Sequence, residues 1–166
     1  TPLIWTISPN EPCFIIKIFD IRYLNLVNEL IIQMSNKSKK ILTEISAGEL
    51  LDKISILEIK IDNIKDKESL VEINKEYESL NKTKDSNIKV TNDLQKLINE
   101  LKETNMNLWK IEDQKRICEK NKDFGNSFIE LARNVYFNND KRAKIKSEIN
   151  NILGSNIKEI KKYADY

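Results

Sequence analysis

The apolar residues of this chain recur at alternating spacings of three and four, and this pattern restricts the possible fold more than any other feature. Between Leu50 and Ile64 the successive spacings are four, three, four and three residues. Since one helical turn takes about 3.6 residues, such positions form a single stripe along a helix. The same pattern recurs at 70–80 and again at 88–111. Three successive amphipathic helices are therefore predicted.

The breaks between these stripes divide the predicted helices. The sequences KDKES (65–69) and KDSN (84–87) interrupt the apolar pattern, and the chain has only 3 Gly and 3 Pro with which to build turns. We therefore predict an all-α protein in which residues 47–120 form a long antiparallel hairpin resembling a coiled coil. Residues 121–166 are expected to form a compact C-terminal helical subdomain packed against that hairpin.

Local signals mark where several helices begin and end. The sequence SAGE (46–49) is a capping box, in which the serine hydroxyl accepts from the glutamate amide and the glutamate carboxylate returns to the serine. A connector is predicted at 121–127, and the side chains of 138–140 are suited to cap the start of a final helix. Gly154 follows the last apolar residue of that helix, where glycine commonly ends a helix.

The segment before Met34 differs from the rest of the chain. Residues 14–32 are mostly apolar, but four charged side chains interrupt them, and each charge at the middle of a bilayer costs about 2.5–3.5 kcal/mol. Neither a membrane span nor a secretory signal fits this composition. Residues 1–33 are interpreted as an extension, from upstream translation or a fusion remnant, and residues 34–166 as a single helical domain. A chain starting at Met34 is expected to fold with undiminished stability.

Composition excludes several classes of function. The formal net charge of +2 is too small for general binding to nucleic acid through its phosphates. The chain has no histidine, which removes histidine-dependent catalytic triads and the commonest zinc ligand, and it has no glycine-rich phosphate loop. No cofactor or metal is predicted. Cys13 and Cys118 lack the spacing of metal ligands, so a reducing cytoplasm is the expected location.

Several charged residues fall on or beside the apolar faces of the predicted helices. Glu112 and Arg116 are an acid–base pair one turn apart on the long helix, and Trp109 and Asp113 lie on the same side. Arg142 falls among the apolar residues of the last helix. The residues singled out in this way are Glu58, Trp109, Glu112, Asp113, Arg116, Arg133, Tyr136, Arg142 and Lys146.

Two interpretations of this polar set remain open. In the first, the charges form interhelical salt bridges that fix how the C-terminal helices dock, because a half-buried charge needs a partner. Substitutions of Glu112 and Arg142 would then be less than additive. In the second, three arginines (Arg116, Arg133 and Arg142) hold an anionic ligand. Trp109 and Tyr136 form an aromatic wall beside it, and Glu112 orients the arginines. The balanced signs of the charges favour the first interpretation.

Two segments of the chain resemble a small bacterial family catalogued as domain of unknown function 6165. They are SAGELLDKISILEIKIDNI (46–64) and the stretch from NLWKIEDQKR to NNILGS (107–155). The resemblance implies a cytoplasmic bacterial protein encoded among surface-polysaccharide and glycosyltransferase genes, and it brings no established activity. The matching positions include Trp109, Glu112, Asp113, Arg116, Arg133, Tyr136, Asn139, Asp140, Arg142 and Lys146.

These observations favour a non-catalytic interaction or assembly module linked to surface-polysaccharide and glycosyltransferase pathways. We expect a protein partner or self-association as a homodimer through exposed heptad seams, with no nucleic acid and no membrane span. The alternative, from a different class, is binding or modification of an anionic small molecule, such as a sugar phosphate or nucleotide sugar, at the arginine, tryptophan and glutamate cluster.

Overall fold

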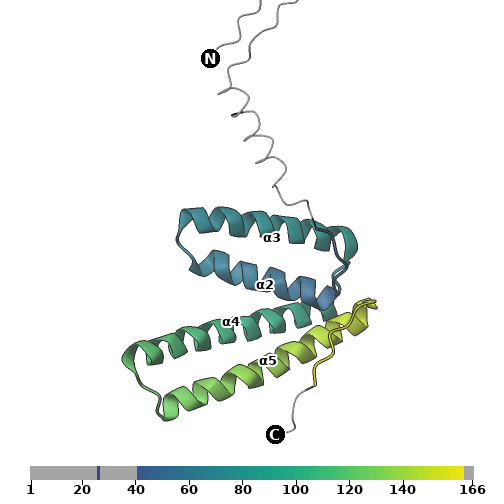
Figure 1. Cartoon of the computed structure of the whole chain (residues 1–166). Coiled ribbons are helices and arrows are strands. Elements are labelled where there is room, and N and C mark those ends of the chain that lie inside the picture. Colours follow the sequence, from purple (N-terminus) through teal and green to yellow (C-terminus); the bar gives the residue numbers. More distant parts are fainter. Residues whose placement is uncertain (1–25, 27–40, 163–166) are drawn as a thin grey trace, which may run out of the picture. The chain divides into compact units, whose positions relative to one another are not determined.

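The computed structural model describes residue 26 and residues 41–162 (Figure 1). The chain divides into two compact units, residues 1–42 and residues 43–166, and the second unit is described here. Its helices are α2 (Ala47–Asn63), α3 (Lys67–Asn87), α4 (Asn92–Asn121) and α5 (Asn126–Leu153). The predictions made for residues 1–33 lie outside the described residues, except for the helical residue Leu26.

The helices form two hairpins, α2 with α3 and α4 with α5 (Figure 1). The second unit is therefore all-α, as the apolar periodicity predicts. The predicted single hairpin over residues 47–120 is not the arrangement found, because α4 packs along α5 and not along α3. The apolar stripes of α2, α3 and α4 are similar in kind, so their spacing alone does not select a partner for each helix.

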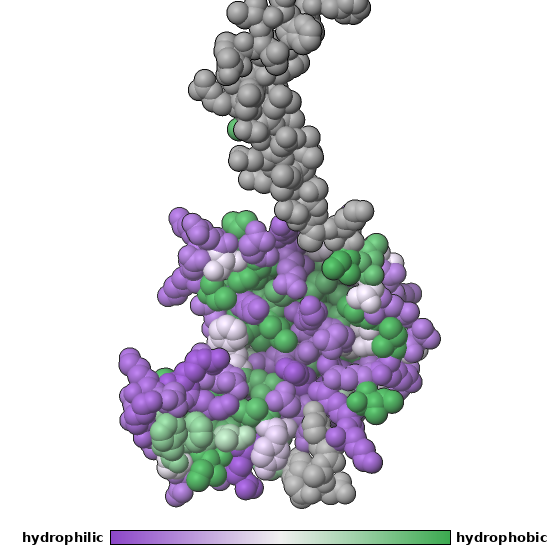
Figure 2. All heavy atoms as spheres, in the orientation of Figure 1, coloured by the Kyte–Doolittle hydropathy of each residue, from purple (hydrophilic) through white to green (hydrophobic). Residues whose placement is uncertain are grey.

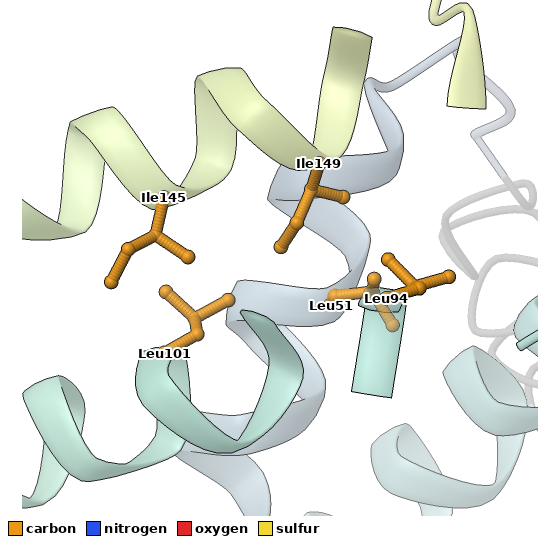
Figure 3. Packing of buried hydrophobic residues seen from close by; sticks show 5 residues of the cluster. All are labelled: Leu51, Leu94, Leu101, Ile145 and Ile149. Carbon is orange, nitrogen blue, oxygen red and sulfur yellow. The ribbon is translucent and has the colours of Figure 1, made fainter. Parts of the chain in front are cut away.

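Helix α2 lies at the centre of the arrangement. It packs against α3, α4 and α5, whereas α3 touches only α2 among the described helices. Helix α2 is contacted on more than one face, since Ile59, on the far side from the stripe that begins at Leu50, is fully buried. The core cluster joins α2, α4 and α5 through Leu51, Leu94, Leu101, Ile145 and Ile149 (Figure 3).

Helix α5 is continuous through residues 138–140, where a new helix start was predicted. The Asn138 and Asn139 side-chain amides donate to the carbonyls of Asn134 and Val135, at 2.8 and 2.9 Å. These side chains therefore bond back by one turn within the helix instead of capping a new one. The predicted connector at 121–127 is confirmed, since α4 ends at Asn121 and α5 begins at Asn126.

The first turn of α2 is capped partly by its own serine and partly by α5. The Ser46 hydroxyl accepts from the Glu49 amide at 3.2 Å, as predicted. The Glu49 carboxylate does not complete the capping box. It lies 2.7 Å from the Lys146 ammonium of α5 instead. The Asn150 side chain of α5 accepts from the Gly48 amide at 2.7 Å.

The close approach of α2 to α5 depends on the missing side chain of Gly48. A Cβ atom at this position would lie 2.6 Å from the backbone oxygen of Lys146, a distance that real Cβ atoms do not reach. Because that neighbour is backbone, it has no rotamer with which to give way. The glycine therefore sets how closely the N-terminal end of α2 docks on α5.

Candidate functional site

A cleft of about 320 Å³ lies between the two hairpins. Its apolar lining comes from Ile56 and Ile59 of α2 and Leu108 of α4. The remaining lining residues are Asn105, Trp109, Glu112, Asp113, Arg116 and Arg142. The cleft thus brings together five of the polar and aromatic residues that the sequence singles out, four from α4 and one from α5.

A buried polar network lies beside this cleft. The Asn105 amide nitrogen donates to the Asp52 carboxylate at 2.8 Å and to the Ser55 hydroxyl at 2.7 Å. The Ser55 hydroxyl in turn donates to the Asp52 backbone carbonyl at 2.8 Å. All three residues are buried, and Asp52 is only 4% exposed. A buried carboxylate needs both hydrogen bonds and a positive charge nearby.

Arg142 supplies that positive charge, but at long range. Its Nε atom lies 4.0 Å from an Asp52 carboxylate oxygen, and its Nη1 atom lies 3.5 Å from the Asn105 side-chain oxygen. The Nε atom is buried and has no hydrogen-bond partner among residues 41–162. The side chain remains 25% exposed and lines the cleft. Arg142 is therefore held from behind by Asp52 and Asn105 without having its hydrogen-bonding capacity filled.

Glu112 is paired with basic residues of its own helix. Its carboxylate lies 3.2 Å from the Lys115 ammonium and 3.6 Å from the Arg116 guanidinium. The predicted pair one turn apart is present, although Arg116 is mostly exposed and such surface pairs contribute little stability. Asp113 is an exposed residue of the same lining. The charged groups of the lining are thus two arginines and two carboxylates.

Glu58 belongs to a separate contact. Its carboxylate lies 2.6 Å from the Lys102 ammonium and accepts a hydrogen bond from the Tyr77 hydroxyl at 3.3 Å. The hydrogen bond to Glu58 raises the pKa of Lys102. Glu58 does not line the cleft, because on a helix it projects about 100° away from its neighbour Ile59. It links α2 to α3 and α4.

Arg133, Tyr136, Asn139 and Asp140 also lie outside the cleft lining. The Arg133 guanidinium forms an exposed pair with Glu130 at 3.8 Å and lies 5.9 Å from the centre of the Phe137 ring. The Tyr136 ring packs on the same Phe137, with ring centres 4.4 Å apart. The third arginine and the tyrosine of the predicted anion site are therefore not beside Trp109, Arg116 and Arg142.

Lys146 ties three parts of the molecule together. Its ammonium lies 2.7 Å from the Glu49 carboxylate of α2 and 2.9 Å from Glu159, which follows α5. Burial opposes the charged form of Lys146, but the hydrogen bonds to these two carboxylates outweigh burial and raise its pKa. The same contact lowers the pKa of Glu159. Lys146 therefore links the segment after α5 to the first turn of α2.

Sequence reasoning missed three buried residues of the site, Asp52, Ser55 and Asn105. A signal for them existed in the apolar stripes. Thr104 and Asn105 stand between Leu101 and Leu108, where the stripe of α4 should continue with an apolar residue. Both Thr104 and Asn105 are buried. An interruption of this kind marks a buried polar network, since a polar residue on a core face must find a partner.

The far end of the α4–α5 hairpin is a second candidate site. We define the distal arm as residues 109–138, which include the connector between the two helices. None of its residues is buried. Ile117, Phe124 and Ile129 are 58%, 49% and 51% exposed. Figure 2 shows apolar and charged side chains side by side at this end, at the lower left.

A shallow groove runs between the two helices of the distal arm. Its volume is about 380 Å³, and its apolar lining includes Ile117, Cys118 and Leu131. Cys118 carries a free thiol and is half-buried. The arm therefore offers an apolar hollow next to exposed apolar side chains, which is the composition of an interaction surface.

The helices and the cleft define an all-α protein built of two hairpins, in which α2 of the first hairpin also packs against both helices of the second. The chain belongs to the family described as Family of unknown function (DUF6165), whose model matches residues 41–165. No curated protein and no solved structure matches the chain. Over the described residues, no helix is long and apolar enough to cross a membrane.

Proposed function

We propose that this protein is a non-catalytic assembly module that forms a homodimer through its distal arm. The proposal includes the pathway expected from the family resemblance, that of surface polysaccharides and their glycosyltransferases. The observation that carries it is the exposure of Ile117, Phe124 and Ile129 on a two-helix arm without a buried residue.

The exposed side chains lie where the helices of residues 47–153 give them little cover. Two packed helices bury one face of each, and they need a second layer to bury the others. Helix α2 supplies that layer only near the core residues, which end at Leu108 in α4 and begin again at Ile145 in α5. A second pair of helices packed on the arm would complete a four-helix arrangement.

Charge favours a second copy of the chain as this partner. The distal arm carries six basic and five acidic residues, which gives a net charge of only +1. Two copies therefore meet without strong mutual repulsion, and the two signs are interspersed so that they can pair across an interface. A two-fold axis would place the same patch on both sides, as in most homodimers.

Sedimentation velocity across the micromolar range tests this proposal. The unchanged protein should approach twice its monomer mass as concentration rises, whereas Ile129→Glu and Ile117→Glu should remain monomers. Val71→Glu is the matched control, because Val71 is 64% exposed on α3, outside the arm. A monomer at every concentration would overturn the proposal, and so would dissociation caused by Val71→Glu alone.

A second candidate function is binding or modification of an anionic small molecule in the cleft. The specific observation in its favour is Arg142, whose side chain is 25% exposed and lines the cleft together with Trp109. A thermal-shift screen against sugar phosphates and nucleotide sugars tests it. A ligand should raise the Tm of the unchanged protein and of Arg133→Gln, and it should not raise that of Arg142→Gln.

A further inference from the structure

The charges around the cleft limit which anion it accepts. Arg116 and Arg142 are matched by Glu112 and Asp113 in the lining, and the carboxylate of Asp52 lies behind Arg142. A dianion such as a phosphate monoester would be repelled by these carboxylates. A monoanion meets less repulsion than a dianion, because it carries half the charge.

Arg142 is suited to a planar anion. Asp52 and Asn105 hold its guanidinium from one side, at 4.0 and 3.5 Å. A guanidinium has five N–H donors in a fixed fork, which matches a carboxylate with two parallel hydrogen bonds. The buried Nε atom lies on the Asp52 side, so a ligand carboxylate would meet the part of the side chain that its 25% exposure leaves in the cleft.

The rest of the lining matches a ring that carries hydroxyl groups. The indole of Trp109 and the side chains of Ile56 and Ile59 offer apolar surface to the C–H face of a saturated ring. Glu112 and Asp113 are acceptors for hydroxyl donors. The volume of about 320 Å³ is at the low end of the range for ligand pockets, which fits one ring better than a nucleotide sugar.

We propose that the cleft between the hairpins binds a hydroxylated ring bearing a single carboxylate, with that carboxylate on Arg142 and the ring against Trp109. This inference rests on the second candidate function and narrows its ligand from an anion in general to a cyclic monocarboxylate. Arg142 is the residue that selects the charged group, and Glu112 and Asp113 select against a second negative charge.

Three probes that differ only at one ring substituent test the inference: D-glucuronate, glucose 6-phosphate and glucose. Binding is followed by the fluorescence of Trp109 in a Trp5→Phe chain, which removes the other tryptophan. Glucuronate should bind about tenfold more tightly than either other probe, a difference of about 1.4 kcal/mol. Glu112→Gln should narrow the difference in affinity between glucuronate and glucose 6-phosphate, because it removes a carboxylate that repels the phosphate.

Arg142→Gln should weaken glucuronate binding by about tenfold or more, because a hydrogen bond to a charged group is worth about 1.5–3 kcal/mol. Arg133→Gln is the matched control and should bind as the unchanged chain does. If circular dichroism shows that Arg142→Gln does not fold, Arg142→Lys replaces it. That variant keeps the charge beside Asp52 and loses the planar fork, so it should also bind weakly.

The outcomes separate this inference from the candidate function on which it rests. Tighter binding of glucose 6-phosphate than of glucuronate, lost in Arg142→Gln, would leave the anion site standing and overturn the carboxylate class. Equal binding by all three probes, or a response unchanged in Arg142→Gln and Arg142→Lys, overturns the inference as well. No response to any probe also overturns it, while the broader thermal-shift screen decides the candidate function.

Discussion

Helix α2 and the distal arm are built from similar amphipathic sequence, yet they differ in how much of that sequence is buried. Eight of the 17 residues of α2 are buried, and the helix packs against α3, α4 and α5. No residue of the arm is buried, and Ile117 and Ile129 are more than half exposed. The difference lies in the number of neighbours and not in the apolar pattern.

This contrast separates two roles within one molecule. Substitutions at the core around α2 remove contacts with several helices, so they should act mainly on the free energy of unfolding. Substitutions on the arm remove surface that the folded monomer leaves in water, so they should act mainly on association. The predictions below test that separation, beginning with the largest expected effect.

Leu101→Ala and Ile117→Ala, both on α4, compare the core with the arm directly. Leu101 is fully buried, and its truncation should lower the free energy of unfolding by about 3 kcal/mol, through lost burial and a residual cavity. Ile117 is more than half exposed, so Ile117→Ala should lower the free energy of unfolding by less than about 0.5 kcal/mol. Urea denaturation of the two variants measures both values. Similar losses would break the comparison.

Two glycines allow the same test with one added methyl group. Gly48→Ala should lower the free energy of unfolding by about 2 kcal/mol, because its Cβ would meet the Lys146 backbone oxygen at 2.6 Å. Gly125→Ala, next to α5 in the arm, should change it by less than about 0.5 kcal/mol. Its Cβ would meet only the Asp123 side chain, at 3.3 Å. Thermal and urea denaturation measure the pair, and a tolerated Gly48→Ala would show that α2 and α5 can separate at little cost.

A double-mutant cycle distinguishes the buried network from the cleft rim. Asp52→Ala and Arg142→Ala should be less than additive, by about 1 kcal/mol, because each removal leaves the other charge without its partner. Glu112→Ala and Arg142→Ala should be additive within about 0.5 kcal/mol, since Glu112 pairs with Lys115 and Arg116. This differs from the expectation based on sequence alone, which coupled the second pair. If urea denaturation showed that Glu112→Ala and Arg142→Ala are less than additive, the expectation based on sequence would be correct.

The smallest expected effect is a pH dependence of the C-terminal segment. The pKa of Lys146 is raised in the folded protein. Its contribution to the free energy of unfolding is therefore complete below the ordinary lysine pKa of about 10.4 and is lost as pH rises through the raised value. The pKa of Glu159 is lowered, so its contribution is complete above about 4.3 and is lost as pH falls through the lowered value.

Lys146→Met should therefore be less stable than the unchanged protein at neutral pH. The gap between their free energies of unfolding should narrow at both acidic and alkaline pH. Chemical denaturation over a pH series measures the gap. Glu112→Gln is the control, because Glu112 pairs only with residues of its own helix, and its free energy of unfolding should follow that of the unchanged protein at alkaline pH. A constant gap between Lys146→Met and the unchanged protein would show that these ion pairs do not hold the segment.

The sequence predicts the elements of this fold better than their pairing. The N-terminal cap of α2 at Ser46 and the connector at 121–127 follow from local chemistry, and both are present. The partner of α4 does not follow, because a stripe of leucine and isoleucine packs equally well on any similar stripe. Nor does the continuity of α5, since asparagines suit either a helix start or a bond back by one turn.

The candidate site shows the same limit. Trp109, Glu112, Asp113 and Arg116 line the same cleft because they lie on one helix, at spacings that fix their common side. The second interpretation groups Arg133 with Arg142, but only Arg142 lines the cleft. Nine residues separate them on the continuous helix α5, which is about 13.5 Å along its axis. A group that spans several helices depends on how those helices dock, and local spacing contains no information about docking.

By itself, the sequence determined the helical class, most helix ends, the family and the α4 half of the cleft, because all of these depend on periodicity and neighbours within a few residues. Only the tertiary structure decided that α2 is the shared centre, that Arg142 stands against Asp52 and Asn105, and that the distal arm is left uncovered. Those features depend on which apolar faces meet across the fold and on contacts as close as that of Gly48 with Lys146.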